Sequence, residues 1–319
     1  MIVAKVEATL KSHTSAVNAV RFTKDGSYCL TCSDDRTVKL WNPFRRSSTE
    51  NGQENDALLI KTYTGAHGYG VLDLVVSHDN ESFASAGHDK TAFLWDVTSA
   101  QVVRRLQGHQ HRINALALNA DSTVLATASY DQHVHLWDLR SKNKTPLQSL
   151  TDCKDSATSV HMSEHRIVVG CVDGVLRTYD LRMGLLHRDD LSIPIVSLQM
   201  DKRGTSALTL CLGKSKGTGS LYKSQLDVPR MQQVWKPSGN STFKSEAHFW
   251  KDGNLVVSGD EEGSLRWWQV DESRGRSSIC LCSTPAHDAP VSSLSCHPQL
   301  SYLLSAGYET IAKLWSVNM

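Results

Sequence analysis

One pattern recurs along the chain and limits the folds that it can adopt. A short apolar run, a tight turn with an acidic residue and a second apolar run end in an aromatic residue, six positions after the acid. The pattern returns about every 40–45 residues, and one interval of about twice that length indicates a weak copy inside it. The pairs are Asp35 with Trp41, Asp89 with Trp95, Asp131 with Trp137, Asp173 with Tyr179, Glu262 with Trp268 and Glu309 with Trp315. Each copy is typical of two paired strands, so the chain should fold as a series of small antiparallel sheets.

The repeated copies predict an all-β fold, in which seven four-stranded sheets surround an axis as the blades of a propeller. Residues 2–10 alternate weakly in polarity and precede the first copy, whereas the last copy ends at Trp315 without an outer strand of its own. An open ring would leave two unpaired sheet edges, which proteins avoid. We therefore expect the N-terminal strand to close the last blade.

Two segments depart from the repeat, although the repeats run through residues 1–319 and predict a single domain. Residues 44–56 are polar and poor in apolar side chains, which predicts a flexible surface loop. The copy at about 193–235 lacks the usual marks, which predicts a degenerate fifth blade.

Charge, hydropathy and cysteine usage narrow the classes of partner and compartment. The chain carries 34 basic and 33 acidic side chains, a net charge of +1, and so offers no general field for nucleic acid or anionic lipid. We find no apolar run long enough to span a membrane and no signal-peptide layout. The 8 cysteines fall mostly in expected strands, which is typical of reduced core residues. We expect a soluble intracellular protein.

The marks Gly108-His109 and Trp137-Asp138 resemble those of WD-repeat proteins. In that family a His, a Ser or Thr, the turn acid and the Trp of one blade form an internal hydrogen-bond network, which satisfies buried polar groups. Ser85 fills the hydroxyl position in the second blade, whereas Ser33 or Thr31 and Ser129 or Thr127 are open alternatives in the first and third. The expected network residues are His13, Asp35, Trp41, His67, Asp89, Trp95, His109, Asp131, Trp137, Asp173, Trp268 and Trp315.

These networks contain Ser, His and Asp, the residue types of a hydrolase triad, but a catalytic site needs one constellation and a structural network is needed in every blade. Gly213-Lys214-Ser215 lacks the upstream Gly of a phosphate loop, because position 208 is Leu. His133 and His135 lie two apart on one strand with no evident third metal ligand, so we expect a solvated or edge position for them. We predict no catalytic residue, metal or cofactor, and therefore no enzyme.

The residues flanking each turn acid should lie exposed around one opening of the ring, together with residues that precede the innermost strands. Large or charged side chains there are the best candidates for binding proteins. They are Asp34, Arg36, Tyr69, His88, Lys90, His111, Arg112, Tyr130, Gln132 and Tyr308.

A closer resemblance lies in three stretches, Gly26–Pro43, Gly65–Asp73 and Val172–Gly184, with the Asn-Pro ending of the first repeat and the Tyr-Asp-Leu-Arg-Met-Gly ending of the fourth. They resemble the mitogen-activated-protein-kinase organizer family of WD-repeat scaffolds. The resemblance implies a noncatalytic scaffold, monomeric within larger assemblies, for kinases of the extracellular-signal-regulated cascade or for splicing factors, in cytoplasm and nucleus. Direct nucleic-acid and membrane binding are not expected.

The segment Trp137-Asp138-Leu139-Arg140 supports an alternative function. It matches the Trp-Asp-x-Arg motif of WD-repeat substrate receptors for cullin-4 ubiquitin ligases. The same residues are also an ordinary repeat ending, in which Arg140 is only solvated.

Overall fold

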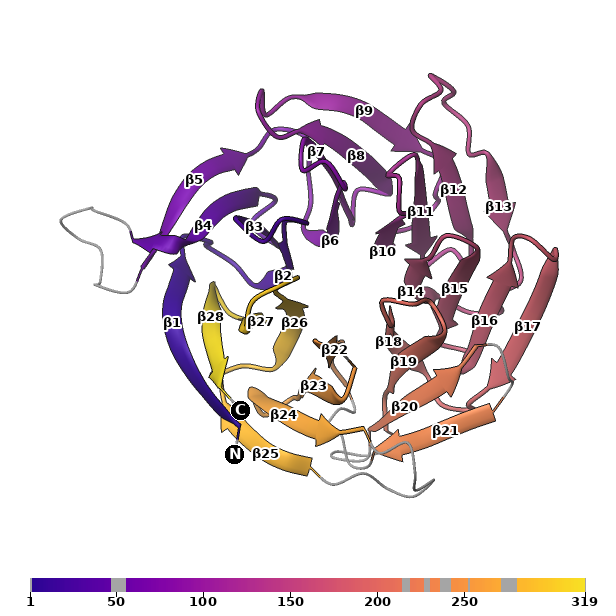
Figure 1. Cartoon of the computed structure of the whole chain (residues 1–319). Coiled ribbons are helices and arrows are strands. Elements are labelled where there is room, and N and C mark those ends of the chain that lie inside the picture. The colour runs from indigo at the N-terminus through magenta and orange to yellow at the C-terminus, as the bar shows by residue number, and fades with distance from the viewer. Residues whose placement is uncertain are drawn as a thin grey trace.

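The computed structural model describes residues 2–46, 56–213, 219–226, 230–235, 242–251, 253–270 and 280–318. The described residues form seven four-stranded antiparallel sheets set in a ring, with the strands of each sheet following one another from the axis outward (Figure 1). The predicted all-β, seven-bladed propeller is confirmed.

Six blades use four consecutive strands each. The first contains β2 (Val17–Phe22), β3 (Cys29–Ser33), β4 (Val38–Arg46) and β5 (Ala57–Tyr63). The second contains β6 (Val71–Val76), β7 (Ser82–Gly87), β8 (Thr91–Asp96) and β9 (Val102–Gln107). The third contains β10 (Ile113–Leu118), β11 (Val124–Ser129), β12 (Val134–Asp138) and β13 (Gln148–Leu150). The fourth contains β14 (Ala157–Met162), β15 (Arg166–Cys171), β16 (Val175–Asp180) and β17 (Leu185–Asp190).

The fifth blade contains β18 (Ile195–Met200), β19 (Ser206–Cys211), β20 (Ser220–Gln225) and β21 (Arg230–Trp235). The sixth contains β22 (Ala247–Trp250), β23 (Leu255–Gly259), β24 (Ser264–Gln269) and β25 (Cys280–Pro285). The seventh contains β26 (Val291–Cys296), β27 (Tyr302–Gly307) and β28 (Ile311–Asn318), with β1 (Val3–Lys11) as its outer strand.

The N-terminal strand closes the ring as predicted. β1 pairs antiparallel with β28, with Val6 opposite Trp315 and Leu10 opposite Ala312. In Figure 1 the indigo β1 lies beside the yellow β28, so the two ends of the chain meet in one blade. This pairing satisfies the backbone groups of β28 that an open ring would leave free.

The core lies between neighbouring blades. Every residue of β3 is buried, as expected for a strand that is covered on both faces. Between the last and first blades, Ala8, Val17, Trp41 and Leu304 belong to one apolar cluster. The blades therefore hold one another through apolar contacts, and the ring presents its loops at two rims.

The two segments that depart from the sequence repeat, residues 44–56 and the fifth blade, differ in the structure. Phe44, Arg45 and Arg46 continue β4, and Arg46 pairs with Ala57, so this part of the predicted loop is strand. Residues 47–55 lie outside the described residues. The fifth blade has all four of its strands. Within the described ranges, we find no helix with the length and apolar character for crossing a membrane.

Candidate protein-interaction surface

In the third blade a buried hydrogen-bond network holds the turn between β11 and β12 in place. His109 Nδ1 lies 2.9 Å from Asp131 Oδ2, and His109 Nε2 lies 2.7 Å from Thr127 Oγ1. The Trp137 indole donates to the same Thr127 oxygen at 3.1 Å. Asp131 also accepts hydrogen bonds from the amides of Gln110 and His133. The network thus ties the loop before β10, the turn after β11 and strand β12 together.

The same network occurs in three other blades. In the first blade, His13 contacts Asp35 and Thr31, and Trp41 donates to Thr31 at 2.9 Å. In the second blade, Ser85 lies between His67 and Trp95. The seventh blade uses His287, Ser305, Glu309 and Trp315. In the first and third blades the hydroxyl group belongs to Thr31 and Thr127, whereas Ser33 and Ser129 bond to backbone carbonyl groups.

The fourth and sixth blades replace the histidine by arginine. Asp173 accepts from Arg177 at 2.6 Å, and the Arg177 side chain is buried. In the sixth blade Trp268 donates to Ser258 at 3.0 Å, but the buried acid is Asp260, which accepts from Arg266 at 2.7 Å. Glu262, the acid expected from the spacing, has a side chain that is 66% exposed. The acid therefore occupies a position two residues earlier in this turn.

The network carboxylates are held ionised. Burial opposes the charge of Asp131, but the hydrogen bond from His109, the charge of His109 and backbone amides outweigh it and hold the pKa of the carboxyl below its usual range. The same balance of burial against His13 and Thr37 lowers the pKa of Asp35. In Asp173, hydrogen bonds from Arg177 and backbone amides overcome burial and lower the pKa to about 2. These groups stabilise the turns and face inward.

The turn residue after the acid carries backbone strain in three blades. Arg36, Lys90 and Gln132 have φ of 69°, 61° and 72°, in the left-handed region that side chains disfavour. In the fourth blade Gly174 follows the acid, and in the sixth blade Gly263, which follows Glu262, occupies the equivalent turn position. Arg36, Lys90 and Gln132 are exposed, so their side chains gain no burial that offsets the strain.

An aromatic and cationic cluster lies on the rim of the third blade. The Arg112 guanidinium lies over the Tyr130 ring at 4.8 Å, and His111 meets the same ring edge-on at 5.8 Å. All three residues are exposed, with Tyr130 at 49%. Cation–π contact and ring packing hold the cluster in place before any partner binds.

The other predicted contact residues lie at the same rim with different environments. Tyr69 is 66% exposed, and His88 is also exposed. Asp34 is exposed and accepts a hydrogen bond from Asn18 at 2.7 Å. Tyr308 is partly buried, because its hydroxyl donates to the Lys244 carbonyl and its ring packs against Phe243. Burial raises the pKa of Tyr308 to about 12.

His133 and His135 differ from each other. His133 is 43% exposed along its side chain, whereas His135 is buried and stacks on His109 with ring centroids 4.1 Å apart. The expected solvated position is therefore wrong for His135. In the described part of the chain, no group of three or more His, Cys, Asp or Glu side chains has an arrangement that could hold a metal ion.

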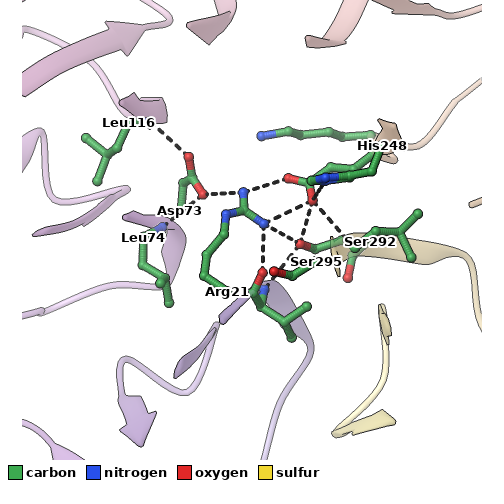
Figure 2. Close-up of polar contacts among 12 residues, drawn as sticks. Arg21, Asp73, Leu74, Leu116, His248, Ser292 and Ser295 are labelled. Carbon is green, nitrogen blue, oxygen red and sulfur yellow. Dashed lines mark hydrogen bonds and ion pairs between the residues drawn. The ribbon is translucent and has the colours of Figure 1, made fainter. Parts of the chain in front are cut away.

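Sequence reasoning missed an ion cluster inside the ring. Arg21 donates to Glu246 at 2.8 and 3.0 Å and to Asp73 at 2.9 Å (Figure 2). Asp73 also accepts from the Leu116 amide, and Glu246 from the Leu294 amide. The cluster therefore joins strands of the first, second, third and seventh blades with the residue that precedes β22 of the sixth. No short-range spacing signals these contacts, because their partners lie in different repeats.

Comparisons with known proteins agree with this geometry. The family described as "WD domain, G-beta repeat" matches residues 4–42, 58–96, 100–138 and 278–316. These segments contain the acid and aromatic residues of the four blades in which the histidine networks occur.

Relatives cover nearly the whole chain. The human WD repeat domain-containing protein 83 is 38% identical, over 93% of this chain and 88% of its own length. The Dictyostelium discoideum WD repeat domain-containing protein 83 homolog is 27% identical, over 99% of both chains. The crystal structure of the RRP9 WD40 repeats superposes with a TM-score of 0.83 at 16% identity, over 99% of this chain and 100% of that one, and so shares the fold. The chain belongs to the WD40-repeat family, with relatives named WD repeat domain-containing protein 83.

Proposed function

We propose that the protein is a noncatalytic scaffold that assembles protein complexes, and that partners bind the rim formed by the turn acids and their neighbours. The observation that carries this proposal is the exposed cluster of His111, Arg112 and Tyr130. Tyr and Arg are enriched among the residues that dominate binding energy, and a prearranged cluster loses little conformational entropy on binding. A rigid ring can hold several partners at once and raise their effective concentration.

The strained turns also support the assignment of partner binding to this rim. A non-glycine residue in the left-handed region costs on the order of 1–2 kcal/mol, and glycine in the same position of other blades avoids that cost. Arg36, Lys90 and Gln132 are exposed and strained. A role in binding explains why side chains occupy these positions.

The finer part of the proposal concerns the partners. The resemblance of 26–43, 65–73 and 172–184 to the mitogen-activated-protein-kinase organizer family suggests components of the extracellular-signal-regulated kinase cascade, splicing factors, or both, in cytoplasm and nucleus. The net charge of +1 favours docking on proteins over direct contact with RNA.

Affinity purification from cytosolic and nuclear extracts, followed by mass spectrometry, tests this proposal. The bait is compared with a triple variant carrying Arg36→Gly, Lys90→Gly and Gln132→Gly, which keeps the turn geometry and relieves its strain. We expect kinase-cascade or splicing proteins with the wild type and their loss with the triple variant, whose melting temperature should not fall. The exposed Lys142→Gly, in the loop before β13, is the control. Unchanged recovery with the triple variant would contradict the rim assignment, and absence of both protein classes would contradict the partner assignment.

Arg140 favours a second candidate, a substrate receptor of a cullin-4 ubiquitin ligase. Its side chain is 75% exposed, and its nearest acidic partner, Asp138, lies at 3.6 Å, so it is accessible to an adaptor. Arg140→Ala should abolish copurification of the cullin adaptor. If wild-type protein recovers no adaptor, this candidate is removed.

A further inference from the structure

A cavity of about 930 Å³ occupies the ring on the side away from the turn acids. The innermost strands line its wall, and the loops after them line its mouth. Residues at the mouth include Lys24 after β2, His78 after β6, Glu164 after β14 and Lys202 after β18. This volume falls in the range of about 300–1,000 Å³ in which proteins bind small molecules.

The ion cluster around Arg21 forms the inner end of this cavity. Figure 2 shows the Arg21 guanidinium directed at Asp73, and the lining of the cavity includes both of these residues and Glu246. Burial opposes the charge of Glu246, but Arg21 and His248 outweigh it and hold the pKa of its carboxyl well below the usual value. The acids at this end are therefore already paired and offer no free charge to a ligand.

Two acidic residues line the mouth, Glu164 and Asp201. The Glu164 side chain is 80% exposed, and its Oε2 lies 3.5 Å from His165 Nε2. Asp201 accepts hydrogen bonds from the Thr205 amide at 2.8 Å, the Ser206 amide at 2.9 Å and the Thr205 hydroxyl at 2.9 Å. These hydrogen bonds use the Asp201 carboxylate to stabilise the loop between β18 and β19. In the described part of the chain, neither Asp201 nor Glu164 forms an ion pair with Lys24, Lys202 or Arg203.

In contrast to Asp201, three cationic side chains at the mouth have no polar partner in the described structure. Within the described ranges, the side chains of Lys24, Lys202 and Arg203 have neither a hydrogen bond nor an ion pair, and all three residues line the cavity. Lys24, Lys202 and Arg203 are exposed to solvent, and the partial desolvation of Lys24 lowers the pKa of its ammonium group. Cationic groups that line a cavity without a counter-charge from the protein are available to bind an anion from solution.

His161 adds an unpaired polar atom deeper in the wall. Its Nδ1 has no hydrogen-bond partner in the described structure, although His161 lines the cavity. Burial, followed by the charges of Lys24 and His248, lowers the pKa of His161 to about 4. At neutral pH this imidazole is therefore uncharged, and the unpaired positive charge at the mouth comes from Lys24, Lys202 and Arg203.

We propose that this cavity binds a small polyanion that carries several phosphate groups. Phosphate oxygens form charge-assisted hydrogen bonds with ammonium and guanidinium groups, and Lys24, Lys202 and Arg203 supply these donors. His161 lies where it can meet an oxygen deeper in the cavity. The site is separate from the proposed protein-binding rim, since the two lie at opposite ends of the innermost strands.

Isothermal titration calorimetry of the full chain with inorganic tripolyphosphate tests the site. Wild-type protein should bind it, and added NaCl should weaken the binding because the contacts are ionic. Lys24→Met and the double variant Lys202→Met with Arg203→Met should each weaken binding about tenfold or more, as expected for the loss of a charge-assisted contact. Lys142→Met removes the same charge from the perimeter and should leave the affinity unchanged.

The outcomes separate the possible explanations. Absence of binding up to about 1 mM tripolyphosphate, or an equal loss with Lys142→Met, would overturn the proposal. A heptaglutamate peptide is titrated in parallel. If the peptide binds through Lys24 and tripolyphosphate does not, the cavity recognises an acidic polypeptide and the assignment to a small phosphate compound is wrong. Neither result depends on the protein-binding rim.

Discussion

At the residue scale, buried side chains determine the positions of the exposed side chains next to them. His109, Thr127 and Trp137 are buried and bond to one another or to Asp131. Tyr130, next to Asp131, is 49% exposed. The buried network thus fixes the backbone on which the exposed side chain stands. Loss of the network should affect stability directly and binding only through the position of the rim.

Asp131→Ala should lower the free energy of unfolding by about 1–3 kcal/mol, because it leaves His109 and the amides of Gln110 and His133 without their acceptor. Thermal or urea unfolding followed by circular dichroism measures the change. Asp34→Ala, at an exposed position in the equivalent turn of the first blade, should change stability much less. Equal stability of the Asp131 variant and wild type would contradict the structural role of the network.

His135 should make the fold sensitive to mild acid. Burial and the charge of His109 lower the pKa of His135 to about 4 from its ordinary value of 6.5, while Asp131 opposes and His133 reinforces that shift. Between these values the unfolded chain binds a proton that the folded chain does not, so stability falls as pH falls from about 6.5 to about 4.

His135→Phe tests this origin of the pH dependence, because Phe93 occupies the equivalent position in the second blade and packs on His67. Melting temperatures from pH 7 to pH 4 should fall less steeply in the variant than in wild type. Part of the slope should remain, since the pKa of His161 is also lowered to about 4. Identical slopes would show that His135 does not contribute.

At the element scale, ring closure depends on a strand that is far from its partner in sequence. β1 pairs with β28 from Val3 to Lys11, and Ala8 is fully buried in the cluster between the last and first blades. The sequence was sufficient to predict this pairing, because a missing outer strand and an unmatched N-terminal strand have one economical solution. Exact strand ends were not predictable: the pairing of Arg46 with Ala57 extends β4 into the expected loop.

Ala8→Asp should destabilise the closed ring, because a carboxylate at that position is buried without a partner. We expect a loss of at least about 2 kcal/mol by urea denaturation, with aggregation through the freed edge of β28. Val3→Asp makes the same chemical change at a residue that is 54% exposed and should be close to neutral. Similar effects of both substitutions would argue against β1 as the closing element.

At the scale of the whole molecule, the blades are joined by apolar contacts between neighbours and by the Arg21 cluster across the ring. Sequence periodicity predicted the seven-bladed propeller, because each blade repeats the same residue types at nearly fixed offsets. It could not predict the cluster, since Arg21, Asp73 and Glu246 belong to different repeats. For the same reason the cavity and its unpaired cations become visible only in three dimensions.

Arg21→Met should destabilise the ring by about 3–5 kcal/mol, because it leaves the buried carboxylates of Asp73 and Glu246 without their cation. Urea denaturation measures the loss. Arg140→Met changes the same residue type where the side chain is 75% exposed, and should have little effect. A small effect of Arg21→Met would mean that the blades do not depend on the cluster.

The most direct test of the account is the affinity of a recovered protein partner for rim and perimeter variants of the intact chain. Surface plasmon resonance with wild type, Tyr130→Ala and Arg140→Ala compares the two surfaces. We predict that Tyr130→Ala weakens binding about tenfold or more relative to wild type, at an unchanged melting temperature. Arg140→Ala should keep the wild-type affinity. Wild-type affinity of the Tyr130 variant together with loss of binding in the Arg140 variant would contradict the account and place the partner on the perimeter.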